Sequence, residues 1–201
     1  ARITVVRNSI RKGFGANHNS AFASCAQPFF CPMNPDIELP ANPFPELLKF
    51  ALDTSVDLIA PLVVSPLGAI EDNLRKFPTF SSLLRKVLGL RDGRYAVVEG
   101  GAVFFSEWVA GMFMLFRSKA FASLEGFDEN YFLYYEDVDI CARAWRHGFR
   151  VVACPKVKVI HDARRDSRRN LRHMRWHIES MARYFSKFWG RLPDVPKAMP
   201  R

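Results

Sequence analysis

The stretch GFDENYFLYYEDVDICARAWRHG, residues 126–148, combines a run of aromatic residues with three closely spaced carboxylates and an amphipathic pattern. It predicts a helix over residues 136–146, because apolar residues recur there at helical spacing. These residues are Val138, Cys141 and Trp145. Glu136 and Asp137 then stand at the amino-terminal end of the helix, where the helix dipole favours negative charge. We expect both side chains at the mouth of a cleft.

Helices and strands alternate on both sides of this stretch. The expected strands span 3–6, 58–64 and 150–154, with a strand or strand pair over 108–117. The expected helices span 43–52 and 80–88, and the sequence KGFGANHNSAF at 12–22 is typical of a turn that leads into another helix. Such alternation predicts an α/β fold with a mostly parallel central sheet.

Composition narrows the class of protein without selecting one. A chain of 201 residues that is 49% hydrophobic can bury one substantial core, so we expect one main domain. The net charge of +9 suits phosphates, nucleic acid or an anionic membrane as partners. No apolar run reaches the length of a membrane-spanning helix, which predicts a soluble or peripheral protein. The four cysteines lack a metal-binding or redox spacing, and we expect reduced, buried thiols.

The carboxylates at the start of the predicted helix are candidates for acid–base chemistry. A carboxylate enclosed by aromatic walls can accept a proton from a sugar hydroxyl, because exclusion of water raises its pKa towards neutrality. The alternative is a cluster that only caps the helix. We adopt the capping role for Asp139, which is spaced to pair with Arg143, and the catalytic role for Asp137.

A second group of polar residues lies outside this helix. Asn34-Pro35-Asp36 follows an apolar run and leaves two polar side chains at a strand edge, where an open α/β sheet binds its ligands. Oxygen ligands of this kind suit Mg²⁺ or Mn²⁺, although a simple turn stays open as the alternative. His161 follows the strand-like segment 156–160 and can complete a metal site that Asp36 begins.

The last part of the chain is basic and aromatic. Six arginines between residues 164 and 175 precede a series of aromatic residues, and the pattern predicts an amphipathic helix. We divide the chain into a catalytic domain over residues 1–167 and this helical segment over residues 168–201. A solvated basic face and a patch for lipid headgroups both explain the arginines, and the second predicts contact with a membrane surface.

Together these motifs resemble bacterial family 2 glycosyltransferases, especially the rhamnosyltransferase-like branch. The motifs are NPD at 34–36, WVAGMFMLFRSKAF at 108–121, the stretch that begins at Gly126, and VKVIH at 157–161. The resemblance covers the chain up to about Ser167. It implies a GT-A-like nucleotide-diphospho-sugar transferase fold. Because such enzymes begin with a strand–helix–strand–helix unit that holds the nucleotide, it also implies that this chain is N-terminally truncated.

The resemblance assigns roles to seven positions. Asp36 and Asn34 stand where the family binds the donor diphosphate, and Asp36 and His161 where it binds Mg²⁺ or Mn²⁺. Asp137 matches the catalytic base, with Glu136 in support. The positions that match the acceptor-side segment are Trp108 and Gly111.

The implied activity is an inverting, metal-dependent transfer of a sugar from a nucleotide-diphosphate donor, with deoxythymidine-diphosphate rhamnose as the branch-specific expectation. The implied acceptor is a saccharide or lipid-linked saccharide, used in cell-surface polysaccharide synthesis at the cytoplasmic face of the membrane. A non-catalytic transferase-like scaffold and a basic nucleic-acid-binding protein remain the alternatives, although we expect no nucleic acid partner.

Overall fold

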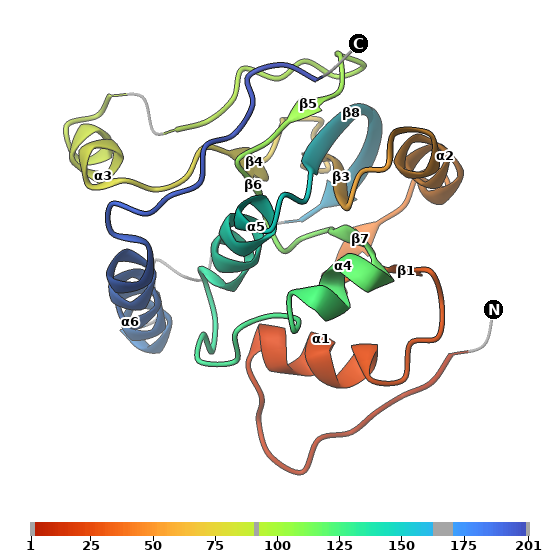
Figure 1. Cartoon of the computed structure of the whole chain (residues 1–201), viewed down its shortest axis with the longest axis horizontal. Coiled ribbons are helices and arrows are strands. Elements are labelled where there is room, and N and C mark those ends of the chain that lie inside the picture. Colours follow the sequence, from red (N-terminus) through yellow and green to blue (C-terminus); the bar gives the residue numbers. More distant parts are fainter. Residues whose placement is uncertain (1–2, 91–92, 163–170, 200–201) are drawn as a thin grey trace.

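The structure, a computed structural model, describes residues 3–90, 93–162 and 171–199. Its centre is a six-stranded sheet with the order β1-β7-β3-β8-β2, and β5 pairs with β8 outside this path. Figure 1 shows the long strands β3 and β8 side by side, with helices α2 and α5 on opposite sides of the pair. All seven residues of β3 (Leu58–Val64) are buried, as expected for a strand that is covered on both faces.

The sheet is mixed, and the expectation of a mostly parallel sheet is wrong. Only β3 and β8 (Val151–His161) run parallel, whereas every other pairing in this sheet is antiparallel. The antiparallel partners are β1 (Phe29–Phe30), β2 (Ile37–Glu38), β5 (Phe104–Phe105) and β7 (Leu115–Arg117). These strands are two or three residues long. A short apolar run has the same sequence pattern in either direction, so periodicity does not predict the direction of pairing.

Several predicted elements are confirmed with small changes of boundary. α5 spans Glu136–Arg146 and β3 spans Leu58–Val64, as predicted. The other confirmed helices are α1 (Phe14–Phe22), α2 (Phe44–Thr54), α3 (Phe80–Val87) and α6 (Leu171–Phe188), and α4 (Ser118–Ser123) was not predicted. The run at 108–117 forms two strands, β6 (Trp108–Val109) and β7, which belong to different sheets.

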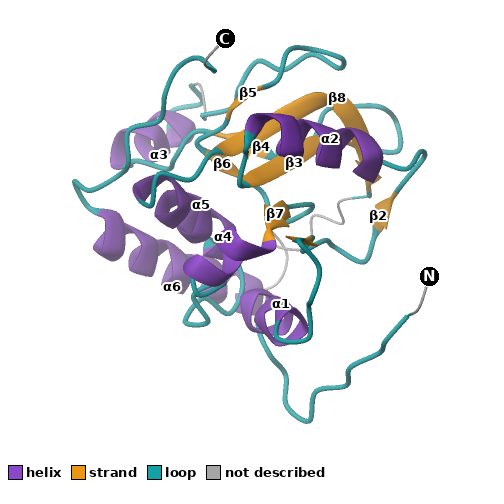
Figure 2. Cartoon of the chain, turned by 45° about the vertical axis from the view of Figure 1, so that its right-hand side comes forward, coloured by secondary structure: helices purple, strands orange, loops and turns teal. Residues whose placement is uncertain are grey.

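The strand predicted at residues 3–6 is wrong. This segment has no regular secondary structure, and the side chains of Ile3, Val5 and Val6 are exposed. Its β-branched residues favour an extended backbone, but a strand also needs a partner, and the described residues supply none. Figure 2 shows the segment as a loop that leads into α1.

The carboxy-terminal helix α6 packs against the same core as the sheet. Tyr184 and Phe188 of α6 are buried, and the Tyr184 hydroxyl donates a hydrogen bond to the Pro78 carbonyl. The boundary proposed at residue 167 lies outside the described residues. In the part of the chain that the structure describes, no helix is both long and apolar enough to span a bilayer.

The four cysteines are free, in agreement with the prediction of reduced thiols. Cys141 and Cys154 are buried, but Cys25 and Cys31 are only half-buried. The expectation of buried thiols therefore holds for two of the four.

Candidate active site

Two consecutive tyrosines form the turn that leads into the amino-terminal end of α5. Tyr134 and Tyr135 have positive φ angles of 72° and 65°, a conformation that costs energy for residues other than glycine. α6 packs against this turn: the Tyr134 hydroxyl lies 3.0 Å from Nδ1 of His173, and both tyrosine rings contact His177. The contacts hold a strained turn immediately before Glu136 and Asp137.

Asp137 is held by two backbone N–H groups. Its Oδ2 accepts a hydrogen bond of 3.0 Å from Gly111, and its Oδ1 accepts one of 2.8 Å from Val138. Burial raises the pKa of the Asp137 carboxyl above the ordinary value of 3.8, while the hydrogen bonds oppose part of the rise. The carboxylate is therefore fixed in direction and is more basic than an ordinary aspartate.

Glu136 is the more deeply buried of the two acids. Burial, followed by the charge of Asp137, raises its pKa well above 4.5. Among the described residues, no hydrogen-bond partner lies within reach of its buried Oε2. We infer that Glu136 keeps its proton under conditions in which Asp137 is ionised, since two adjacent buried carboxylates resist double ionisation.

Asp137 opens into a cavity of about 220 Å³. The second small sheet forms one wall, because β4 (Leu74–Arg75) pairs with β6 and places Arg75 next to Trp108. The Arg75 guanidinium lies 5.9 Å from the Trp108 ring, and the indole N–H donates to the Lys76 carbonyl. The rest of the lining comes from α3, from α5 and the tyrosine turn before it, and from His177. The cavity thus combines aromatic walls, cations and one basic carboxylate.

Asn34, Asp36 and His161 form a second cluster. Oδ1 of Asp36 lies 3.3 Å from Nε2 of His161, and Nδ2 of Asn34 lies 3.3 Å from the same nitrogen. These side chains lie close together because β2 pairs with β8, so that Ile37, next to Asp36, lies opposite His161. The side chain of Asp36 is 51% exposed, whereas that of His161 is 7% exposed.

The residues of this cluster fit a divalent cation that is also held by a diphosphate. Asp36 offers carboxylate oxygens, His161 offers an imidazole nitrogen, and a flip of the Asn34 amide presents its oxygen. Nδ1 of His161 is buried without a hydrogen-bond partner among the described residues. Those residues include no group of three or more His, Cys, Asp or Glu side chains suited to a metal. One carboxylate with substrate phosphates is nevertheless a usual way to bind Mg²⁺.

A short backbone segment connects the two clusters. Gly111 donates to Asp137, and the carbonyl of the next residue, Met112, accepts a 3.0 Å hydrogen bond from the Asn34 N–H. Met33 and Phe113 then form a β-bridge. Of the seven predicted positions, Gly111 lies in this segment, and Asn34 and Asp137 contact it directly. Asp36 and His161 join it through Asn34, while Trp108 and Glu136 line the same cavity as Asp137.

Sequence reasoning missed the basic and aromatic residues that complete the cavity. Arg75, Lys86 and His177 come from three separate elements and carry no local motif. Of the six arginines between residues 164 and 175, those at 164–169 lie outside the described residues.

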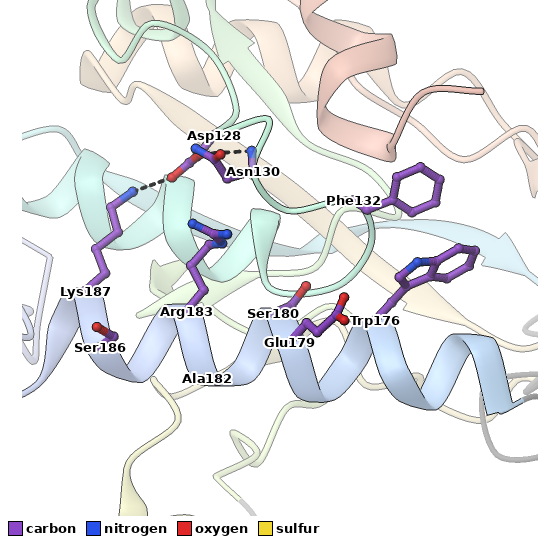
Figure 3. Close-up of a pocket in the computed structure, with 10 residues that line it drawn as sticks. All are labelled: Asp128, Asn130, Phe132, Trp176, Glu179, Ser180, Ala182, Arg183, Ser186 and Lys187. Atoms are coloured by element: carbon purple, nitrogen blue, oxygen red, sulfur yellow. Dashed lines mark hydrogen bonds and ion pairs between the residues drawn. The ribbon is translucent and has the colours of Figure 1, made fainter. Parts of the chain in front are cut away.

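A larger hollow of about 740 Å³ lies elsewhere, between α6 and the loop at residues 128–132. Figure 3 shows Asp128, Asn130 and Phe132 facing α6 across this hollow, with Lys187 paired to Asp128. None of the predicted site residues lines it. The smaller cavity, which contains Asp137, is therefore the candidate active site.

Comparison with curated proteins gives several relatives with known activities. The rhamnosyltransferase WbbL of Escherichia coli strain K12 is 29% identical over 187 residues, which cover 87% of this chain and 70% of that protein. The N-acetylglucosaminyl-diphospho-decaprenol L-rhamnosyltransferase of Mycobacterium tuberculosis is 27% identical over 146 residues, 64% of this chain and 45% of that protein. The pre-mycofactocin glycosyltransferase of M. tuberculosis is 30% identical over 162 residues, 81% of this chain and 33% of that protein.

Two solved structures share the fold. The mannosyltransferase PcManGT from Pyrobaculum calidifontis, in complex with GDP-Man and Mn²⁺, aligns with a TM-score of 0.57 at 17% identity, over 98% of this chain and 48% of that chain. GalNAc-T7 with UDP, GalNAc and Mn²⁺ aligns with a TM-score of 0.58 at 15% identity, over 79% of this chain and 31% of that chain. The chain thus has an α/β fold similar to that of GT-A glycosyltransferases.

A sequence profile described as "Glycosyltransferase like family 2" matches residues 1–178. This match covers most of the chain, and it agrees with the activities of the curated relatives, which are rhamnosyltransferases and other glycosyltransferases. The chain therefore belongs to glycosyltransferase-like family 2, and its enzyme class is that of the glycosyltransferases.

Proposed function

We propose that this chain carries the catalytic site for transfer of a sugar from a nucleotide-diphosphate donor to an acceptor hydroxyl, with Asp137 as the general base. The observation that supports this most strongly is the placement of Asp137. Its carboxylate is fixed by two backbone N–H groups, has a raised pKa and opens into a cavity walled by Trp108. A base with these properties suits deprotonation of a hydroxyl near neutral pH.

The reaction is an inverting single displacement. The acceptor oxygen attacks the anomeric carbon of the donor, its proton passes to Asp137, and the bond from that carbon to the diphosphate oxygen breaks. The diphosphate leaves with the electron pair of that bond. Glu136, protonated next to Asp137, keeps the negative charge on Asp137 alone. Trp108 forms an aromatic wall against which the acceptor packs, while Gly111 orients the base.

The cluster of Asn34, Asp36 and His161 is the proposed site for Mg²⁺ or Mn²⁺ and the donor diphosphate. A bound cation would neutralise charge that develops on the departing diphosphate. The Mn²⁺ in both structurally similar transferases supports this proposal. The cavity adds Arg75, Lys76 and Lys86, whose positive charges favour an anionic substrate.

The relatives favour particular substrates. Two of them are rhamnosyltransferases, which supports a rhamnosyl donor such as deoxythymidine-diphosphate rhamnose. The name of the mycobacterial relative specifies transfer to N-acetylglucosaminyl-diphospho-decaprenol, which supports a lipid-linked saccharide as acceptor. An enzyme that uses such an acceptor must act at a membrane surface. We therefore propose that this chain acts at the cytoplasmic face of the membrane, in cell-surface polysaccharide synthesis.

The test is a transfer assay with labelled nucleotide sugars and a soluble, short-chain acceptor. Asp137→Asn keeps the size of the side chain and removes its basicity, so the turnover rate should fall by about 10²–10⁴-fold. Asp53→Asn makes the same change at an exposed position on α2 and should leave the rate unchanged. Equal rates for the two variants would exclude Asp137 as the base. If neither the wild type nor the variants transfer sugar, the result would favour a non-catalytic scaffold.

A further inference from the structure

Helix α3 exposes its apolar face to solvent. Phe80 and Leu84 lie on one side of the helix, one turn apart, and Leu88 continues the same spacing at the residue that caps its carboxy-terminal end. They are 51%, 61% and 64% exposed, and no described side chain on α3 is buried. A surface helix of a globular domain normally turns such a stripe towards the core. An exposed apolar stripe on an ordered helix indicates a binding surface.

The helix is firmly built, so its orientation is a property of the fold. Thr79 and Ser82 form a reciprocal cap, in which each side-chain oxygen accepts a hydrogen bond from the backbone N–H of the other residue. The segment just before the helix is tied to α6, because Tyr184 donates a hydrogen bond to the Pro78 carbonyl. Figure 1 shows α3 at the periphery of the molecule, away from the central sheet.

Aromatic side chains from the end of α6 extend the apolar stripe. The ring centroid of Phe80 lies 4.2 Å from that of Phe185 and 4.5 Å from that of Trp189, which is 67% exposed. A hollow of about 350 Å³ opens between these rings and is bordered by Pro78 and Leu192. Trp at the edge of an apolar surface is typical of the boundary between lipid and water.

The charge around the stripe selects the partner. Residues 76–90 contain no aspartate or glutamate but contain Lys76, Arg85 and Lys86. An exposed apolar helix face next to the exposed Arg85 and Lys86 suits a bilayer with anionic headgroups, which attract the cations while the apolar side chains enter the lipid. The net charge of +9 acts in the same direction.

We propose that α3, together with Trp189, is a docking surface for an anionic lipid bilayer. The other side of α3 faces the catalytic cavity, because Ser82, Leu83 and Lys86 line it with Asp137. Docking therefore brings the bilayer surface next to the base. Resting on the proposed function, this arrangement presents the hydroxyl of a lipid-linked acceptor to Asp137 while its lipid remains in the membrane. The proposed contact lies on α3 and Trp189.

Vesicle binding of the full chain tests the proposal without any substrate. Wild-type protein should sediment with vesicles of phosphatidylcholine and phosphatidylglycerol more strongly than with phosphatidylcholine alone. The double variant Leu84→Ser, Leu88→Ser should partition at least about tenfold more weakly, since two exposed apolar side chains that enter the lipid are lost. The matched control, Leu52→Ser with Leu67→Ser, makes the same change at exposed leucines elsewhere and should bind like wild type.

Three results would overturn the docking surface. The first is that the wild type does not bind vesicles. The second is that the two double variants bind vesicles equally well. The third is that the wild type forms dimers in sedimentation without lipid, and that the α3 variant does not form them. Circular dichroism and melting temperature check that both variants fold. Transfer to the soluble, short-chain acceptor should persist in the α3 variant. Loss of lipid binding is thereby distinguished from loss of the proposed activity.

Discussion

The backbone N–H of Gly111 donates a hydrogen bond of 3.0 Å to Oδ2 of Asp137. The next residue, Met112, accepts a hydrogen bond from the N–H of Asn34. Consecutive residues of one turn therefore bind the proposed base and the backbone of Asn34, which belongs to the proposed diphosphate cluster. Because consecutive Cα atoms are about 3.8 Å apart, the spacing between the two clusters is set by rigid backbone geometry. This relationship places the contacts to the two clusters on adjacent residues of the chain, in agreement with the proposal of a single site.

The first prediction concerns the pH dependence of transfer. Asp137 must be ionised to accept a proton, and burial raises its pKa above 3.8. Activity should therefore fall as the pH decreases, with a midpoint above the ordinary range of aspartate. A plot of kcat/KM against pH for the wild type gives this midpoint, since it reports the ionisation of the free enzyme.

Glu136→Gln is the control for this pH profile. A glutamine resembles the protonated glutamic acid that we assign to position 136, so the acidic limb of the profile should stay near its wild-type position. A limb that disappears in Glu136→Gln would show that Glu136 is the titrating base. A wild-type limb at the ordinary aspartate value would contradict the effect of burial on Asp137.

The second prediction concerns the metal. Addition of Mn²⁺ with uridine or thymidine diphosphate should raise the melting temperature by about 5 °C or more at about 100 times the dissociation constant, because ligands that bind only the folded state stabilise it. The nucleotide without Mn²⁺ should have a smaller effect. Asp36→Ala should remove the metal-dependent part of the rise in melting temperature, since Asp36 supplies the carboxylate next to His161.

Asp53→Ala is the matched variant for the thermal shift, because it removes an exposed carboxylate far from the cluster along the chain. It should keep the full shift. A metal-dependent shift that survives in Asp36→Ala would place the cation elsewhere. A shift from Mn²⁺ alone that is equal in all proteins would indicate non-specific binding.

The sequence predicted those parts of the fold that depend on local pattern. α5 has the predicted boundaries because its apolar residues recur at helical spacing and Gly148 follows its end. Patterns that depend on a partner were less informative. Residues 3–6 have the composition of a strand but no strand beside them, and the short strands around β3 and β8 gave no sign of their direction.

α3 shows the same limit for amphipathic helices. Its apolar spacing predicted the helix, and the usual orientation would bury Phe80 and Leu84. The structure exposes them because the opposite side of the helix, with Ser82 and Lys86, faces the cavity that contains Asp137. Periodicity predicts that a helix has two faces, but the tertiary fold decides which of them meets solvent.

The candidate site divides in a similar way. Motifs identified Asp36, Asp137 and His161, and the structure places Asp36 next to His161, while the roles of all three remain predictions. Arg75 and His177 were not found, because they reach the cavity only through the β4–β6 pairing and the packing of α6. Asp139 pairs with Arg143 as predicted, but its second partner, Lys187, comes from α6.

The last prediction concerns this second partner. Nζ of Lys187 lies 2.6 Å from Oδ1 of Asp139 and 2.9 Å from Oδ2 of Asp128. The side chain of Asp139 is fully buried, so removal of a cation there leaves a charge that only Arg143 still offsets. Although burial alone would raise the pKa of Asp128, hydrogen bonds from Lys187 and Asn130 hold it at about 2. Lys187 therefore fastens α6 to two carboxylates.

Lys187→Met should lower the free energy of unfolding by about 2 kcal/mol, less than for a fully buried pair because Lys187 is 33% exposed. Urea unfolding at neutral pH measures this difference, and Lys49→Met, at an exposed site on α2, should change stability little. The folded-state pKa of Asp128 lies below its unfolded value, so its contribution to stability is present above about pH 4 and is lost as the pH falls towards 2. The difference between wild type and Lys187→Met should accordingly narrow in acid. A difference that is constant with pH would mean that Lys187 stabilises α6 through the packing of its aliphatic chain and not through its charge.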